Sequence, residues 1–153
     1  LCAACPLHGL CKARAAGTAP TLPRKAAPKA RKVAPVTVAL VESGGNFLIR
    51  QRPEKGLLAG LWEPLLWEGE ALTPGELHEK LTAMGLVCEA EAIAPLPEAK
   101  HIFSHIEWRM TQYAVPAPPQ PAPEGTVWAS REQLRTEYTL PGAFKACKKY
   151  LGL

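Results

Sequence analysis

The sequence predicts an α+β fold in which helices pack on the faces of a mixed β-sheet. Three observations support this class. Short apolar runs bounded by turn-forming residues recur along most of the chain, as expected for strands. Two segments carry helix-start signals. The chain has 153 residues and 47% apolar content, which is enough for one domain with a real core and a tail.

Six segments rich in β-branched, aromatic or other apolar residues are predicted to be strands. They are 36–42, 46–52, 62–67, 87–96, 106–115 and 126–129. A turn at 43–45 joins the first two strands, and a loop at 97–105 joins the two longest. The segment 116–123 contains five prolines, so we expect a stiff surface connection there.

The strongest helix signal begins at Thr73, which is followed by Pro74 and by Glu76 three positions on. These residues suit the N-cap, N1 and N3 positions of a helix. Apolar residues then recur at helical spacing until Gly85, a typical helix end. Ser130 is expected to cap a second, short helix. A last helix covers 141–150, with an inner face formed by Ala143, Phe144, Cys147 and Leu151.

Residues 14–35 are predicted to be a linker because they are rich in Ala, Pro, Lys and Arg and lack apolar periodicity. The first 35 residues carry seven lysines and arginines and no acid, although the net charge of the whole chain is only +4. Such a segment suits nucleic-acid phosphates, and a merely solvated linker is the alternative. The predicted organisation is a cysteine segment at 1–13, a linker at 14–35 and a domain at 36–153.

Three cysteines, Cys2, Cys5 and Cys11, crowd the start of the chain. Thiolates at short spacing are typical of metal or iron–sulfur sites, which need four ligands. The simplest interpretation places the fourth ligand upstream, so that the chain is the C-terminal part of a longer protein. A zinc knuckle completed by His8 and an unstructured remnant are the alternatives.

The remaining composition argues against two locations. No run approaches the roughly 20 apolar residues that a membrane helix needs, and no signal-peptide pattern opens the chain. Five cysteines without disulfide-like spacing favour a reducing compartment. We therefore expect no membrane association.

Four features together resemble the C-terminal third of the adenine DNA glycosylases of the MutY type. The cysteine segment is similar to the last three ligands of that family's [4Fe–4S] cluster. The stretch 56–63 (Gly-Leu-Leu-Ala-Gly-Leu-Trp-Glu) is similar to one typical of the family's C-terminal domain. The segment 101–105 (His-Ile-Phe-Ser-His) resembles its lesion-contacting loop. Trp128 and the closing helix resemble the end of that domain.

The resemblance implies a Nudix-like fold and a role in base-excision repair. Its partner would be double-stranded DNA in which 8-oxoguanine lies opposite a mispaired adenine. The excision chemistry of the family lies in a helical N-terminal domain, so no catalytic residue is assigned to this chain and the fragment alone is expected to be inactive. The parent protein would carry the [4Fe–4S] cluster through Cys2, Cys5 and Cys11, and the cluster is expected to be absent or incomplete in this fragment.

A Nudix-like fold raises the question of nucleotide hydrolysis. Aligned on Gly85, the Nudix motif requires two metal-binding glutamates at positions where this chain has Thr82 and Ala83. Without these carboxylates the chain lacks the oxygen ligands that Mg²⁺ prefers. Glu70 and Glu79 of the motif are kept. The sequence therefore favours a Nudix-like domain used for recognition.

The lesion differs from guanine because its N7 becomes a donor and its C8 carries a carbonyl oxygen. A serine hydroxyl can donate or accept, so Ser104 is the right residue type to read that edge. Phe103 can wedge beside the lesion, and His105 can contact phosphate or orient Ser104. The alternative is structural: a core phenylalanine, a turn serine and a surface histidine.

Charged residues elsewhere have plainer interpretations. Arg50, Arg52 and Lys55 are interpreted as solvated hairpin charges, with phosphate contact as the alternative. The acidic group of Glu63, Glu68 and Glu70 is interpreted as surface charge rather than a metal site. The four tryptophans are expected in or beside the core: Trp62, Trp67, Trp108 and Trp128.

Two other functions remain open from the sequence. One is a Nudix-type nucleotide hydrolase. The other is a protein-interaction module that docks through the proline-rich segment 116–123 and the basic linker. The main hypothesis remains a monomeric, lesion-recognising fragment in the bacterial cytoplasm, associated with the nucleoid.

Overall fold

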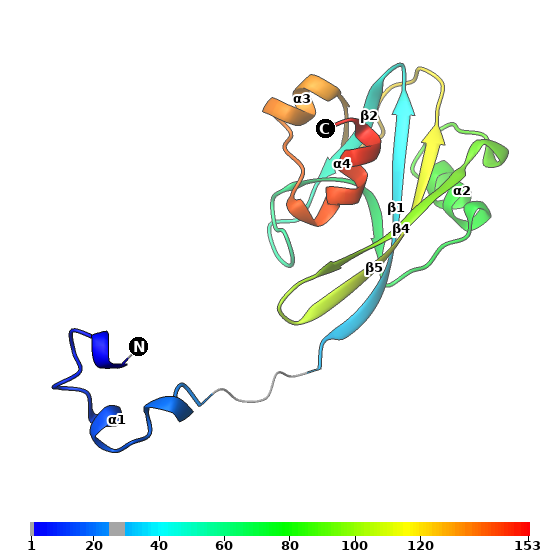
Figure 1. The fold of residues 1–153 in the computed structure, drawn as a ribbon. Helices are drawn as coiled ribbons and strands as arrows, with labels where there is room; N and C mark the ends of the chain where they lie inside the picture. Colours follow the sequence, from blue (N-terminus) through cyan, green and yellow to red (C-terminus); the bar gives the residue numbers. More distant parts are fainter. Residues whose placement is uncertain (1, 25–29) are drawn as a thin grey trace. The chain divides into compact units, whose positions relative to one another are not determined.

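The computed structural model describes residues 2–24 and 30–153 (Figure 1). Residue 1 and residues 25–29, which fall in the predicted linker, lie outside the described residues. The chain divides into two compact units, Leu1–Ala30 and Arg31–Leu153. No helix in the described part of the chain is long and apolar enough to cross a membrane.

The larger unit is built on a six-stranded mixed sheet, which confirms the predicted fold class. Its strand order is β4-β5-β1-β3-β2-β6. The central strand β1 runs parallel to β5, from the pair Lys32–Ile106 to the pair Glu42–Pro116, and antiparallel to β2 and β3. The strands are β1 (Lys32–Ser43), β2 (Asn46–Gln51), β3 (Trp62–Glu68), β4 (Ala94–Ile102), β5 (Ile106–Pro116) and β6 (Thr126–Ser130).

Helices cover both faces of the sheet because β1 alternates its side chains between two cores. Ala39 and Val41 face the core that contains Leu77 and Leu81 of α2 (Pro74–Ala83). Val38 and Leu40 face the opposite core, shared with the turn η4 (Gly142–Phe144) and with α4 (Lys145–Leu151). A third cluster packs α3 (Arg131–Thr136) beside β2 and β6. Figure 1 shows α2 on one side of the sheet and α4 on the other.

The two predicted helix caps are confirmed, whereas the last helix begins at Lys145 rather than at Pro141, after the turn η4. Thr73 accepts a hydrogen bond from the Glu76 N–H, and the Glu76 carboxylate accepts one from the Thr73 N–H, which completes a capping box. Ser130 and Gln133 form a second capping box at α3. Gly85 lies just beyond α2 with φ +83°, a left-handed conformation that favours glycine. The four residues predicted for the inner face of the last helix are all buried: Ala143, Phe144, Cys147 and Leu151.

One strand prediction was wrong. The segment 87–96 is largely a connection that includes the turn η3 (Ala90–Ala92), and β4 begins only at Ala94. The prediction ended this strand at Leu96, before Pro97. Pro95 and Pro97 both lie inside β4 and are tolerated there, because β4 lies at the sheet edge and shifts its register between Leu96 and Ala99.

The start of the domain also differs from the prediction, since β1 begins at Lys32 rather than at Val36. In its described residues the smaller unit contains three short elements: η1 (Cys2–Ala4), α1 (Lys12–Ala15) and η2 (Ala19–Thr21). The predicted linker therefore includes the end of α1, η2 and the first residues of β1 within its described parts.

Candidate nucleic-acid interface

The three predicted lesion-contacting residues form the tip of the β4–β5 hairpin. The Phe103 N–H donates to the Ile106 carbonyl over 2.8 Å and closes the turn. Ser104 and His105 are exposed, and Phe103 is half-buried. The expected loop at 97–105 was too long, because β4 continues to Ile102 and leaves only residues 103–105 outside the strands. A short turn on two long strands presents these side chains more rigidly than a free loop would.

The Phe103 ring lies between two other aromatic rings. His101 stands edge-to-face against it at 4.6 Å between centroids, and Trp108 does so at 5.0 Å. Phe103 also packs against the core cluster that contains Trp108. Such pairs stabilise a ring beyond the area they bury. Phe103 is therefore anchored by these contacts while it stays partly exposed.

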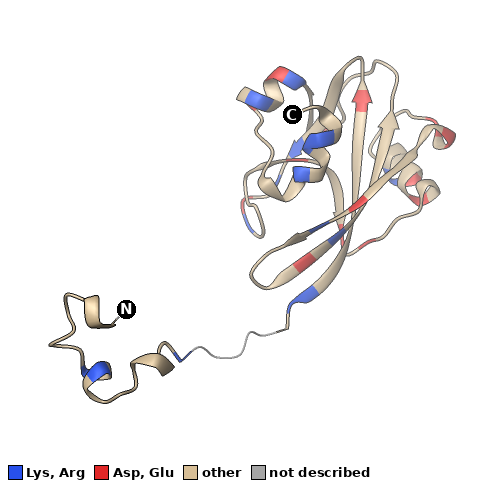
Figure 2. Cartoon of the chain, in the orientation of Figure 1, with Lys and Arg blue, Asp and Glu red and all other residues tan. Residues whose placement is uncertain are grey.

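The start of β1 lies beside this tip. The Lys32 N–H donates to the His105 carbonyl over 3.2 Å, so the chain enters the domain next to the hairpin turn. Lys100 and Arg109 face each other across the same hairpin. Figure 2 shows basic residues at the start of β1 and along the hairpin, interrupted by acidic ones. This arrangement places cations near an exposed hydroxyl and an imidazole.

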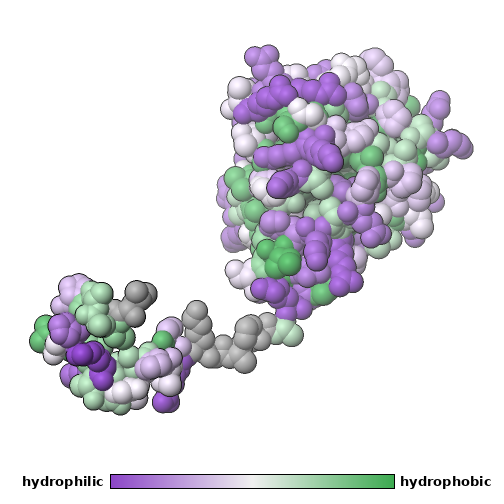
Figure 3. All heavy atoms as spheres, viewed as in Figure 1, coloured by the Kyte–Doolittle hydropathy of each residue, from purple (hydrophilic) through white to green (hydrophobic). Residues whose placement is uncertain are grey.

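Exposed apolar side chains lie beside the tip of the same hairpin. Val33 and Ile102 are each 47% exposed, although both are large and apolar. Figure 3 shows a hydrophobic patch over the end of the hairpin, with hydrophilic residues beside it. A surface that combines apolar, hydroxyl and cationic groups can contact both the bases and the backbone of a nucleic acid.

A hollow of about 510 Å³ lies along the sheet face of β4, β5 and the start of β1. Its lining contains two basic residues, Lys100 and Arg109, and two acidic residues, Glu98 and Glu107. Arg109 contacts Glu107 at 3.3 Å. Because the cations and carboxylates balance, the hollow itself has no strong preference for an anion.

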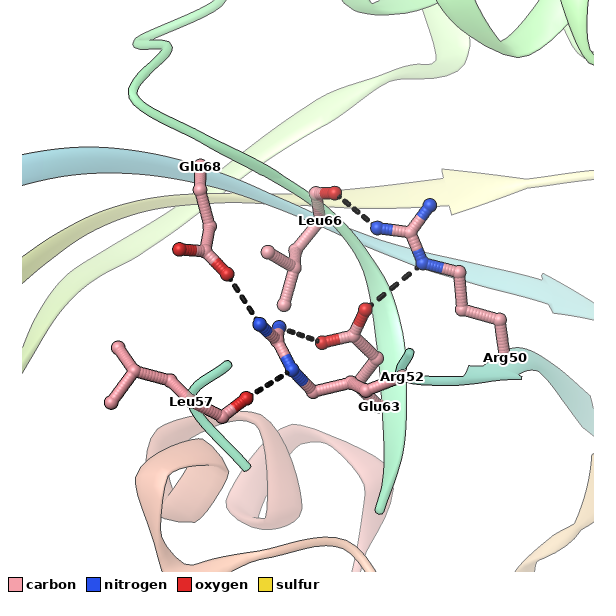
Figure 4. Close-up of polar contacts among 6 residues, drawn as sticks. All are labelled: Arg50, Arg52, Leu57, Glu63, Leu66 and Glu68. Carbon is pink, nitrogen blue, oxygen red and sulfur yellow. Dashed lines mark hydrogen bonds and ion pairs between the residues drawn. The ribbon is translucent and has the colours of Figure 1, made fainter. Parts of the chain in front are cut away.

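The charges of the β2–β3 region do not lie free in solvent, so the interpretation as solvated hairpin charges was wrong for Arg50 and Arg52. Glu63 is only 1% exposed and contacts Arg50 Nε at 2.9 Å and Arg52 Nη1 at 2.6 Å. Arg52 also contacts Glu68 and the Leu57 carbonyl (Figure 4). The interpretation of Glu63 as surface charge was wrong as well, whereas Glu68 and Glu70 are exposed.

This network keeps Arg52 charged. Burial alone would lower the pKa of Arg52, but its hydrogen bonds to Glu68 and Glu63 raise that pKa above the ordinary value. Arg52 also lies over the Trp108 ring, 5.6 Å from its centroid. Sequence analysis missed this contact, because β2 and β5 are far apart in the chain and not neighbours in the sheet.

The former metal positions of the Nudix motif do not form a site. Thr82 and Ala83 are exposed on α2, and Glu70 pairs with Lys80 at 2.8 Å. His78 contacts the Cys88 carbonyl at 3.0 Å. No group of three His, Cys, Asp or Glu side chains that could hold a metal occurs within residues 2–24 and 30–153. Among the described residues, the Nudix helix therefore carries Thr82 and Ala83 where the motif has two metal-binding glutamates.

The same finding applies to the cysteine segment. Cys2 is exposed, and Cys5 and Cys11 are half-buried free thiols. Cys2 lies in η1 and Cys11 is the N-cap of α1. Within the described part of the chain these thiols belong to no group of three side chains that could hold a metal, and their assignment as cluster ligands stays a prediction.

The proline-rich segment is held on the domain by Gln120. Its side chain exchanges hydrogen bonds with the backbone N–H and carbonyl of Val87, and its carbonyl accepts the Trp128 indole N–H over 2.9 Å. The other tryptophans also lie in or beside the cores, and Trp108 is fully buried. This confirms their expected placement.

Comparisons with known proteins agree with this geometry. A family model described as the NUDIX domain matches residues 36–150. Human adenine DNA glycosylase is 30% identical over 141 residues, which cover 85% of this chain and 26% of the relative. The mouse adenine DNA glycosylase is 34% identical over 128 residues, covering 72% of this chain and 24% of the relative. The chain thus spans about a quarter of the length of these relatives.

Solved structures give the same picture. The C-terminal domain of mouse MUTYH, in complex with human PCNA, matches with a TM-score of 0.62 and 26% identity, covering 76% of this chain and 86% of that one. A MutT protein from Methanosarcina mazei matches with a TM-score of 0.59 and 18% identity, covering 80% of this chain and 94% of that one. The second likeness concerns the fold alone.

Proposed function

The chain belongs to the NUDIX domain family, and on that premise we propose that it is the lesion-reading C-terminal part of an adenine DNA glycosylase. Its partner would be double-stranded DNA with 8-oxoguanine opposite a mispaired adenine. The observation that carries the proposal is the meeting of Phe103, Ser104 and His105 at one anchored hairpin tip. Relatives named adenine DNA glycosylase support it.

The chemistry of the tip suits an oxidised purine. The lesion offers a donor at N7 and an acceptor at O8, where guanine has only an acceptor at N7. The exposed Ser104 hydroxyl can accept from N7–H or donate to O8, and the neighbouring backbone supplies the complementary group. Phe103 contributes an apolar edge that can disturb the stack beside the lesion. His105 and the nearby cations would contact the phosphates.

This chain would supply recognition and not excision. The exposed Thr82 and Ala83 leave the Nudix helix without metal carboxylates, so nucleotide hydrolysis is the weaker candidate. Base removal would depend on residues that we do not assign here. In the parent protein Cys2, Cys5 and Cys11 would contribute thiolates to a [4Fe–4S] cluster. No step of lesion reading depends on that cluster.

The proposed setting is a monomer acting on the bacterial nucleoid in the cytoplasm. The mouse neighbour was solved in complex with human PCNA, and a protein partner remains a second candidate for this chain. The structure supports DNA binding by the hairpin better than protein binding by the proline-rich segment, because Gln120 and Trp128 hold that segment on the domain.

The test compares adenine removal opposite 8-oxoguanine and opposite guanine, using the parent protein with and without residues 36–153. We expect truncation to abolish the preference for 8-oxoguanine while removal opposite guanine persists. Ser104→Ala should lower the preference about 2- to 10-fold, the value of one net hydrogen bond. Thr82→Ala, which removes another exposed hydroxyl, is the matched control and should leave it unchanged.

Two results would contradict the proposal. A preference that survives truncation would place lesion reading outside this domain. Release of phosphate from 8-oxo-dGTP in the presence of Mg²⁺ would favour a hydrolase instead.

A further inference from the structure

Arg52 connects two regions that the sequence does not relate. It follows the last residue of β2, and its side chain is only 9% exposed. Each guanidinium nitrogen has a partner: Nε donates to the Leu57 carbonyl, Nη1 to Glu63 and Nη2 to Glu68. Figure 4 shows the guanidinium held between these three acceptors. A planar group fixed along three edges has very little freedom to rotate.

The guanidinium of Arg52 lies over the Trp108 ring. Its carbon is 5.6 Å from the centroid of the Trp108 ring, within the range of a cation–π contact. Trp108 is fully buried, and among the described residues its indole N–H has no hydrogen-bond partner. Packing alone therefore sets the orientation of this indole. Within its core cluster, its cation–π contact is with Arg52, and its aromatic contacts include Phe103 at 5.0 Å and Phe144 at 6.3 Å.

We propose that Arg52 is a positioning residue that fixes Phe103 at the hairpin tip through Trp108. The inference rests on the proposed function, because it assigns Arg52 a part in lesion reading. Phe103 is half-buried and touches Trp108 edge-to-face. A turn of the indole would move the Phe103 ring, and ligand-contacting groups lose effect when displaced by about 1 Å.

Arg50 provides an internal control. It shares Glu63 with Arg52, with its Nε 2.9 Å from the carboxylate, and donates to the Leu66 carbonyl. Its side chain is 32% exposed. The two arginines share one carboxylate, whereas the cation–π contact with Trp108 and the ion pair with Glu68 are made by Arg52.

The first experiment follows Phe103 directly. The full chain is labelled with fluorophenylalanine, whose three sites are Phe47, Phe103 and Phe144, and studied by ¹⁹F NMR. Arg52→Lys keeps the positive charge but replaces the planar guanidinium, with its three hydrogen-bonding nitrogens, by a single ammonium. We expect it to shift the Phe103 resonance and leave that of Phe47 in place. Arg50→Lys should leave both in place. An unchanged Phe103 resonance in Arg52→Lys overturns the inference, whatever the protein does with DNA.

The second experiment measures lesion preference in the parent protein. Arg52→Lys should lower the preference for 8-oxoguanine over guanine about 3- to 10-fold, and Arg50→Lys should leave it near the wild-type value. Combining Arg52→Lys with Phe103→Ala should add nothing to Phe103→Ala alone. Additive losses would mean that Arg52 does not act through Phe103 and would overturn the inference.

The two experiments separate the inference from its premise. If Phe103→Ala leaves the preference intact, the proposed function fails and the role of Arg52 in reading fails with it. If Phe103→Ala lowers the preference and Arg52→Lys does not, only the inference fails. Should Arg52→Lys not fold, Glu68→Gln removes one anchor of Arg52 at a carboxylate that is 39% exposed, and the same criteria apply.

Discussion

Neutralising Glu63 should destabilise the domain far more than neutralising its neighbour Glu68. Glu63 is 1% exposed and contacts two arginines, whereas Glu68 is 39% exposed and contacts one. Removing one partner of a buried ion pair costs about 3–5 kcal/mol. Glutamine keeps one acceptor oxygen, and the half-exposed Arg50 can turn to water. We therefore expect about 2–4 kcal/mol for Glu63→Gln.

The assay is equilibrium unfolding in urea of the full chain, its Glu63→Gln variant and the Glu68→Gln control. An exposed pair contributes at most about 1 kcal/mol, so the control should change the midpoint little. The urea dependence of the free energy of unfolding should be the same in all three proteins, because the surface exposed on unfolding does not change. Equal destabilisation by the two variants would refute the reasoning that burial makes Glu63 the central anion of the network.

Four further predictions concern other elements. Thr73→Ala should lower the free energy of unfolding by about 1 kcal/mol because the α2 cap is lost, measured by urea unfolding. Hydrogen bonds from the Thr73 backbone and side chain lower the pKa of Glu76. The contribution of Glu76 to the free energy of unfolding should therefore be complete at pH values above the ordinary carboxyl pKa, and it should disappear as the pH falls through the lowered pKa. A melting temperature independent of pH in that range would contradict this. Gly85→Ala should destabilise by about 1 kcal/mol because φ is +83°, whereas Gly75→Ala inside α2 should stabilise, and thermal melts should show opposite signs. Burial raises the pKa of Cys147 to about 12, so iodoacetamide followed by mass spectrometry should leave Cys147 unmodified in the native chain and modify the exposed Cys2.

Much of the fold could be predicted because local signals agreed with it. The Thr73–Glu76 pair, the Ser130 cap and the buried face of the last helix all follow from side chains close in sequence. The β4 boundaries could not be predicted, because Pro95 and Pro97 are compatible with a strand only at a sheet edge. Whether a strand lies at the sheet edge depends on the order of all six strands, and no local sequence pattern predicts that order.

The hairpin tip could be predicted from local sequence, whereas the arginine network could not. Phe103, Ser104 and His105 are consecutive, so a resemblance over a few residues was enough to nominate them. To predict the role of Glu63, one must know that it pairs with Arg50 across β2 and β3. One signal was present: a carboxylate directly before an apolar run on a predicted strand needs a cationic partner if that strand is buried. The connection of ten residues between the strands left the register open.

The parallel pairing of β1 with β5 has a consequence for how the chain is made. One edge of β1 can pair with β3 as soon as that strand emerges from the ribosome, but the other must wait for β5. About 70 residues separate the ends of these two strands, which at roughly 5–20 residues per second is a delay of several seconds. During that interval the longest strand of the domain has an unpaired side. Chaperone dependence and misfolding during synthesis should therefore be most sensitive to changes in β1, although β1 contributes no side chain to the hairpin tip.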